Sequence, residues 1–283
     1  MGGIQKLVTV VQSGLAWDLK DIRNQRGLTL EDVCDKLRWQ QSKLSRMEQG
    51  QQCISQVDLG ALLAIYEVHG KERQRLLHLT ERQDDPGRWE TYLPEAPGPR
   101  TFFRLEPEAT ALVATQLLFV PGLAQTADYT RAVMKAGYVP PEQVEARVAE
   151  RMERRKILTR SKPPKLTMIV AEIALRRVFG SPKIMAVQLR TMLDIAELPN
   201  VRLWVVPSAR TADAAFNDSF YLMDFPHDKS VVVLDSATST VFLEESDKID
   251  FYRRHASRLV KAALNPDESA NFLATLTKEY QRE

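Results

Sequence analysis

The sequence predicts a two-domain α+β protein, with an all-α N-terminal bundle and a C-terminal α/β domain whose mixed sheet has about five strands flanked by helices. Apolar residues recur at helical spacing through residues 15–84, strand-like runs appear within residues 165–245, and a Pro- and Gly-rich stretch separates the two regions. We therefore expect an N-terminal extension over 1–14, a helical domain over 15–84, a linker over 85–100 and a C-terminal domain over 101–283.

Bulk composition narrows the class of protein only modestly. A hydrophobic fraction of 44% is ordinary for a globular chain, and a net charge of +2 favours no particular partner. Cys34 and Cys53 are too few for a disulfide framework and fit a reducing cytosol. No apolar run approaches the roughly 18 residues that a membrane helix needs, and the apolar patch near Met1 is too short for a secretory signal. We expect a cytoplasmic protein with no membrane partner.

Five short helices are expected in the N-terminal domain. In the first, Leu15, Leu19 and Ile22 repeat on one helical face. In the second, Thr29 can cap the helix, with Asp32 three residues on as a variant of the capping box. Four of the expected helices cover residues 15–26, 29–37, 55–68 and 71–83. The remaining helix, third in order, lies in the stretch that starts at Trp39 and is ended by Gly50.

The third helix lies in the stretch WQQSKLSRMEQGQQ, residues 39–52. At 100° per residue, Leu44 and Met47 point together into the bundle. The opposite face carries hydroxyl, amide and cationic groups, namely Ser42, Ser45, Arg46 and Gln49, flanked by Gln41 and Lys43. Such groups can bind phosphates and base edges in a major groove. Two short helices with a brief turn and a polar outer face on the second are typical of a helix-turn-helix.

The competing interpretation is that this polar face is simply solvated, as most charged faces are. Between Leu15 and Val68 there are seven Lys and Arg residues and eight Asp and Glu residues, a net charge of −1. Nucleic-acid-binding domains are usually more basic than that. The residues alone therefore leave both interpretations open.

The stretch LKDIRNQRGLTLEDVCDKLRWQQSKLSRMEQGQQCISQVDLGALLAIYEV closely resembles the helix-turn-helix of the phage-repressor-like XRE family. The matching features are RGLTLEDV at the entry to the second helix, SKLSRMEQG in the third and LGALLAIYEV in the fourth. The resemblance covers about 55 residues. It implies a lambda-repressor-like bundle and double-stranded DNA as the partner.

The resemblance also implies residue roles. Gln41, Ser42 and Arg46 occupy positions that read bases, and Arg46 suits bidentate contact with guanine. Phosphate and sugar contacts fall to Gln40, Lys43 and Ser45. Glu48 and Arg23 are implied to form a structural pair away from the bases. Two departures from the family pattern concern the turn: Arg38 stands where Gly is common, and Gln40 replaces the usual Ser cap.

The C-terminal region looks like the domain of unknown function found in antitoxin-like XRE regulators of actinobacteria. The resemblance rests on FFRLEPEATALVATQLLFVPGLAQTADYTRAVMKAG, VRLWVVPSAR, FNDSFYLMDFP, VVVLDS, TVFLEES and ALNPDESANFL. It implies that a small partner protein encoded nearby is a second candidate partner.

Within this region the pattern predicts a strand–helix–strand unit, 165–172, 182–198 and 201–207, whose strands we expect to pair in parallel. Short connections favour antiparallel neighbours among the next three runs, which cover 219–225, 230–236 and 238–245. Further helices are expected over 108–119, 125–136, 141–161, 246–264 and 267–280.

No pattern in the sequence indicates catalysis, a metal or a cofactor. The four histidines lack the spacing of a zinc site: His69, His78, His227 and His255. Nucleophile-elbow, P-loop and dinucleotide motifs are absent, and Asp194 and Glu197 read as ordinary surface charges. We expect no enzyme.

Two segments of the C-terminal region leave alternatives open. Residues 207–218 are either a binding loop or a plain surface turn. The helix over 141–161 is rich in Lys and Arg, which either touch DNA outside the main site or form ion pairs on a solvated face, such as Glu150 with Arg154.

Three hypotheses follow. The first is a dimeric, sequence-specific transcriptional regulator associated with the nucleoid, with a C-terminal domain that senses a ligand or binds a partner. The second is an antitoxin-like interaction module whose main task is to hold a small protein. The third is a small-molecule sensor, which requires a pocket that the sequence cannot show.

Overall fold

The computed structural model describes residues 10–81, 98–137, 139–212, 214–226, 229–236 and 240–282. The chain forms two compact units. The first holds Met1–Arg104 with Thr238–Glu245, and the second holds Leu105–Ala237 with Ser246–Glu283. Most of the expected linker, residues 85–97, lies outside the described residues, as do residues 1–9 of the expected extension. The fold class predicted from the sequence is confirmed, with six strands rather than about five.

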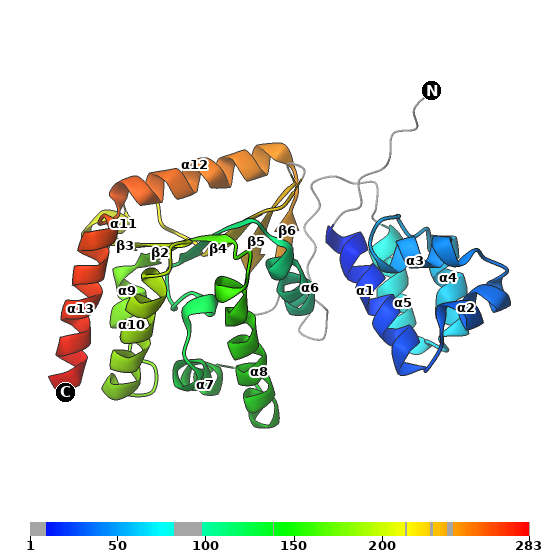
Figure 1. The fold of residues 1–283 in the computed structure, drawn as a ribbon, viewed down its shortest axis with the longest axis horizontal. Helices are drawn as coiled ribbons and strands as arrows, with labels where there is room; N and C mark the ends of the chain where they lie inside the picture. The colour runs from blue at the N-terminus through cyan, green and yellow to red at the C-terminus, as the bar shows by residue number, and fades with distance from the viewer. Residues whose placement is uncertain are drawn as a thin grey trace. The chain divides into compact units, whose positions relative to one another are not determined.

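The N-terminal domain is a bundle of short helices, drawn in blue and cyan in Figure 1. Its first helix begins at Val10, five residues before the point that the sequence predicts. The helices are α1 (Val10–Gln25), α2 (Leu30–Leu37), α3 (Gln41–Glu48), α4 (Gln56–Ile65) and α5 (Gly70–Glu81), followed by α6 (Gly98–Leu105). One apolar core holds the bundle together, and Leu15, Leu19 and Leu44 are almost fully buried in it.

The sheet of the C-terminal domain has the strand order β3-β2-β1-β4-β5-β6, and its edge strand β6 is the segment that the division into compact units assigns to the first unit. Its strands are β1 (Ala111–Gln116), β2 (Lys165–Ala171), β3 (Val201–Val206), β4 (Phe220–Asp224), β5 (Ser230–Asp235) and β6 (Thr240–Leu243). The expected parallel pairing of β2 with β3 is confirmed, and so is the antiparallel pairing of β4 with β5.

The prediction of a helix over 108–119 was wrong. This segment contains the short turn η1 (Glu106–Glu108) and then β1, which pairs in parallel with β2 and antiparallel with β4. The run ALVATQ fits a helical period as well as a strand, and neighbours on both sides decide between them. Thr115 reinforces the strand, because its hydroxyl donates to the carbonyl of Phe220 and accepts from the amide of the same residue.

Helices cover both faces of this sheet (Figure 1). One face is covered by α12 (Ser246–Ala262), and the other by α7 (Ala127–Ala136), α8 (Pro141–Arg154) and α10 (Pro182–Ala196). At one end, α13 (Pro266–Arg282) packs along α10 and β3. The remaining short elements are η2 (Gly122–Ala124), η3 (Arg155–Thr159), α9 (Glu172–Arg176) and α11 (Ser208–Thr211).

Candidate nucleic-acid interface

The turn between α2 and α3 is only three residues long, Arg38 to Gln40. Thr29 and Asp32 form a complete capping box at the start of α2. Arg38 ends the helix with φ of 55°, a left-handed conformation that a side chain makes unfavourable. Gln40 precedes α3 in an extended conformation and makes no side-chain cap. Both departures noted in the sequence therefore have the local geometry expected of them.

Helix α3 is divided into a buried and an exposed face. Leu44 and Met47 have no solvent exposure, as the helical wheel predicts. Five of the six side chains to which the sequence assigns DNA contacts lie on α3, and the sixth, Gln40, directly precedes it. Gln40, Gln41, Ser42 and Arg46 are exposed, whereas Lys43 and Ser45 are half-buried.

A buried ion pair anchors α3 to α1. Arg23 Nε donates to Glu48 Oε1 at 2.6 Å, and Arg23 Nη2 donates to Glu48 Oε2 at 2.9 Å. Arg23 Nη1 also donates to the Leu28 carbonyl at 2.6 Å, so the guanidinium ties α1 to the entry of α2 as well. The hydrogen bond to Glu48 is the main cause of a raised pKa at Arg23. Glu48 faces the bundle, away from the polar face of α3.

Lys43 has partners that sequence reasoning missed. Its Nζ lies 2.7 Å from Asp58 Oδ1 on α4 and 3.9 Å from the centroid of the Trp39 ring. The ammonium is therefore held by a carboxylate and an aromatic face at once. Asp58 could have been suspected, because it lies in the first turn of the next helix, but only the packing of α4 brings it to Lys43.

Arg46 is the least constrained cation of the α3 face. Its Nε makes one long hydrogen bond, 3.4 Å, to Gln52 Oε1. Ser45 accepts a hydrogen bond from Gln49 Nε2 at 3.0 Å. An exposed guanidinium with several donors to spare can bind a phosphate or the edge of a guanine.

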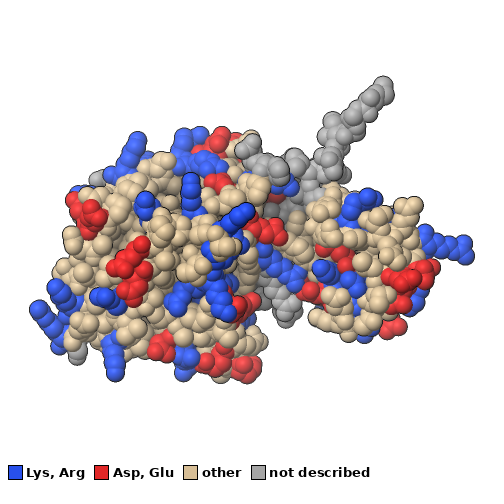
Figure 2. Space-filling model, viewed as in Figure 1, with Lys and Arg blue, Asp and Glu red and all other residues tan. Residues whose placement is uncertain are grey.

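The charge of this domain is mixed. Figure 2 shows basic and acidic side chains interspersed over the visible N-terminal helices, with no single basic stripe. Such a mixed surface offers little general electrostatic attraction to a polyanion.

The basic helix over 141–161 proves to be α8 followed by η3. The expected ion pair of Glu150 with Arg154 was wrong. Arg154 is buried and donates two hydrogen bonds to Glu106, at 2.8 and 2.9 Å. The sequence could not reveal this pair, because Glu106 is 48 positions away and lies before β1.

The other candidates provide little chemistry. Residues 207–218 contain α11 and bury Ala214 and Phe216, so part of this segment belongs to the core. Among the described residues no group of His, Cys, Asp and Glu could hold a metal ion. His227 lies outside the described residues, and the side chain of His78 is not described. No helix in the described ranges has the length and apolar character needed to cross a bilayer.

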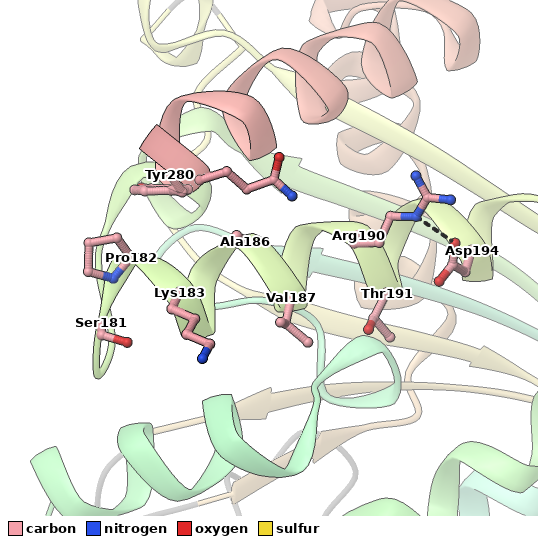
Figure 3. A pocket seen from close by; sticks show the side chains of 10 residues that line it. Ser181, Pro182, Lys183, Ala186, Val187, Arg190, Thr191, Asp194 and Tyr280 are labelled. Atoms are coloured by element: carbon pink, nitrogen blue, oxygen red, sulfur yellow. Dashed lines mark ion pairs between the residues drawn. The ribbon is translucent and has the colours of Figure 1, made fainter. Parts of the chain in front are cut away.

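A surface hollow of about 670 Å³ lies along α10 and α13. Figure 3 shows Lys183, Val187 and Arg190 along α10, with Tyr280 contributed by α13. Asp194 is exposed there and pairs with Arg190 at 3.3 Å, a dashed line in Figure 3. This ordinary surface ion pair agrees with the interpretation of Asp194 as a surface charge.

Comparison with protein families matches both domains. Residues 15–76 match a family described as helix-turn-helix domain, and residues 99–275 match one described as domain of unknown function (DUF5753). The comparisons with curated proteins and with solved structures find no match. A helix-turn-helix domain suggests a DNA-binding regulator. Because the second match spans more than half of the sequence, the chain belongs to the DUF5753 family, and it carries a helix-turn-helix domain at its N-terminus.

Proposed function

We propose that this chain is a sequence-specific, DNA-binding transcriptional regulator of the XRE type rather than an enzyme. The observation that carries the proposal is the exposed polar face of α3, which the buried pair of Arg23 and Glu48 anchors to the bundle. The family match to a helix-turn-helix supports it. The domain boundaries at 15–84, 85–100 and 101–283 and a cytoplasmic, nucleoid-associated location belong to the same proposal.

In this proposal Gln41, Ser42 and Arg46 contact base edges, while Gln40, Lys43 and Ser45 contact phosphate and sugar. Lys43 gives up its contact with Asp58 or shares it when a phosphate approaches, which distinguishes its role from that of Arg46. The protein acts as a homodimer, because a single short helix reads too few bases. Two α3 helices about 34 Å apart fit successive major grooves on one side of a palindrome.

The experiment first selects bound sequences from random duplex DNA and then compares variants on the best site. Arg46→Ala is expected to weaken specific binding by roughly 5- to 150-fold, the equivalent of about 1–3 kcal/mol for one bidentate base contact. Binding to unrelated DNA should change far less. Lys71→Ala, an exposed cation at the start of α5, is the matched control and should bind the site as the wild type does.

Unchanged affinity and sequence preference in Arg46→Ala would show that α3 does not read the bases. If Arg46→Ala and Lys71→Ala lose the same affinity for the selected site, the protein binds DNA through general electrostatic attraction alone. Sedimentation of the complex with a palindromic duplex tests the dimer, for which two chains per duplex are expected.

A second candidate function is an antitoxin-like module that holds a small partner protein encoded nearby. The mixed charge of the N-terminal domain favours it, since seven basic residues face eight acidic ones between Leu15 and Val68 and Asp58 already neutralises Lys43. Exposed apolar side chains on the C-terminal domain, among them Val187 beside the hollow, offer contact area.

Capture of a stoichiometric small protein from the native host tests this candidate. The full chain should retain the partner, and Val187→Glu should lose it if the hollow is the contact surface. DNA binding measured on the same preparations shows whether the two activities coexist. If no partner is captured while specific DNA binding is present, only the regulator function remains.

A further inference from the structure

Four exposed side chains follow one another along α10. They are Lys183, Val187, Arg190 and Asp194, which we call the α10 stripe (Figure 3). Their separations of four, three and four residues keep all of them on one side of a helix. Val187 is 54% exposed, and all four residues line the hollow of about 670 Å³ between α10 and α13. The stripe thus presents an apolar side chain to solvent among charged neighbours.

The charges of α10 are arranged against the dipole of the helix. The first turn of a helix carries a partial positive charge and the last turn a partial negative charge, so acids are favoured at the start and bases at the end. Lys183 lies in the first turn of α10, Asp194 lies in the last turn, and Glu197 follows at the C-cap. The first turn contains no acid and the last turn no base. This charge pattern does not stabilise α10 within a single chain.

Contacts within the chain use only part of this charge. Arg190 pairs with Asp194 at 3.3 Å, but the two side chains remain 72% and 58% exposed. In the ranges that the structure describes, neither Lys183 nor Glu197 has an ion-pair partner. A cation near the start of α10 and an acid at its end are therefore both available to a partner outside the chain.

The α10 stripe is complementary to an antiparallel copy of itself. Its separations read the same in both directions, so one register places Lys183 opposite Asp194 twice and Val187 opposite Arg190 twice. Each Lys183 then meets an acid of the other copy, and each Val187 packs against the aliphatic part of an arginine. The opposed helix dipoles favour the same orientation. A parallel arrangement would instead place each charge opposite a like charge.

We propose that the α10 stripe is an interface between two copies of this chain, which pack antiparallel about a two-fold axis. Such an interface uses the same surface on both copies and therefore requires a surface that matches itself. Side chains of the second copy enter the hollow beside Tyr280 and Gln281, so that α13 adds contact area to the helix pair. The charges that oppose the dipole of α10 in one chain become attractive contacts between the two.

This inference rests on the proposed function, because it names the surface that forms the proposed homodimer. The two can nevertheless fail separately. The test below contains no DNA, so its failure leaves the reading of bases by α3 standing. A chain that dimerises through α10 while Arg46→Ala keeps wild-type DNA recognition would remove the proposed role of α3 and leave this interface intact.

The experiment measures the mass of the full chain by sedimentation equilibrium at low salt, over a range of concentrations. Lys183→Glu places two acids opposite each other at both ends of the helix pair, and Asp194→Lys places two lysines there. Mixing the two variants restores attraction at both ends. Each variant brings a charge that suits the helix dipole, so both should fold. Lys261→Glu makes the same change on the exposed surface of α12, which covers the other face of the sheet, and is the matched control (Figure 1).

The wild type and Lys261→Glu should be dimers of equal strength. Lys183→Glu and Asp194→Lys should each raise the dissociation constant of the dimer at least about tenfold, because like charges then face each other. Their equimolar mixture should form dimers at concentrations where each variant alone is a monomer. The proposal is overturned if the wild type is a monomer, if the single variants dimerise as the wild type does, or if their mixture stays monomeric. A monomer that holds a small host protein at Val187 would assign this surface to that partner instead.

Discussion

Each domain contains a buried arginine that donates two hydrogen bonds to a buried glutamate. The two ion pairs differ in the charged groups that surround them. Arg23 and Glu48 are 7% and 5% exposed, and Arg154 and Glu106 are 9% and 1% exposed, so burial is closely matched. In the N-terminal domain the pair is electrically balanced, and Arg23 also donates to the Leu28 carbonyl. In the C-terminal domain Arg151 adds a second cation beside the pair.

This difference separates an electrically balanced pair from a pair with a further cation as its neighbour. A buried ion pair can repay the cost of its desolvation when its hydrogen bonds are well aligned, and it can then hold two helices together. The guanidinium of Arg151 has no such balance with Arg154: its pKa is lowered, first by burial and then by repulsion from Arg154. The N-terminal domain accepts an unfavourable conformation of a different kind, in the backbone of Arg38 next to the α3 face.

The largest expected effects come from removing the carboxylates. Glu48→Gln and Glu106→Gln should each lower the free energy of unfolding of their domain by about 3–5 kcal/mol, because a buried guanidinium loses its counter-charge. We expect Glu106→Gln to be the more severe, since it leaves two cations together. Urea unfolding, followed by hydrogen exchange of peptides from each domain, measures both.

A double variant sharpens this comparison. Adding Arg151→Met to Glu106→Gln should restore part of the lost stability, because it removes the repulsion of Arg154. Glu31→Gln, on the exposed surface of α2, should change stability by no more than about 0.5 kcal/mol. Glu48→Gln and Glu106→Gln could instead lower the free energy of unfolding equally, with no recovery when Arg151→Met is added. That result would mean that Arg151 does not repel Arg154.

The next effect concerns the backbone strain at Arg38. Arg38→Gly should stabilise the N-terminal domain by about 1 kcal/mol, because relief of a left-handed residue outweighs the greater freedom of glycine in the unfolded chain. Arg38→Ala keeps a Cβ atom and should give no such gain. Thermal unfolding of the two variants makes the comparison. A gain in Arg38→Ala equal to that in Arg38→Gly would locate the strain in the long side chain and not in the backbone.

The smallest effect concerns the half-buried pair of Lys43 and Asp58. Asp58→Asn should cost less than about 1 kcal/mol of stability, because solvent screens this pair. It should also free Lys43 for a phosphate, so that DNA affinity rises at low salt and the slope of log K against log salt steepens by about one. Glu67→Gln removes an acid after α4 and should leave that slope unchanged. An unchanged slope in Asp58→Asn would remove Lys43 from the set of phosphate contacts.

The sequence by itself determined the local features of the N-terminal domain. The capping box of Thr29 and Asp32 depends on neighbouring residues, and the burial of Leu44 and Met47 on a helical period. These signals lie within a few positions of one another and can be read from the chain. Arg38 was suspect through the family resemblance, because it stands where glycine is common, and the structure gives it a φ of 55°.

Only the tertiary structure decided the features that join distant segments. The run ALVATQ is a strand because β2 and β4 pair with it on both sides, and not because of its own period. Lys43 meets Asp58 through the packing of α4, and Arg154 meets Glu106 across 48 positions. The physical reason is that burial and charge pairing depend on which segments become neighbours in space. For the same reason, the hydrogen bond of Arg151 to Gln125 became visible only in the folded domain.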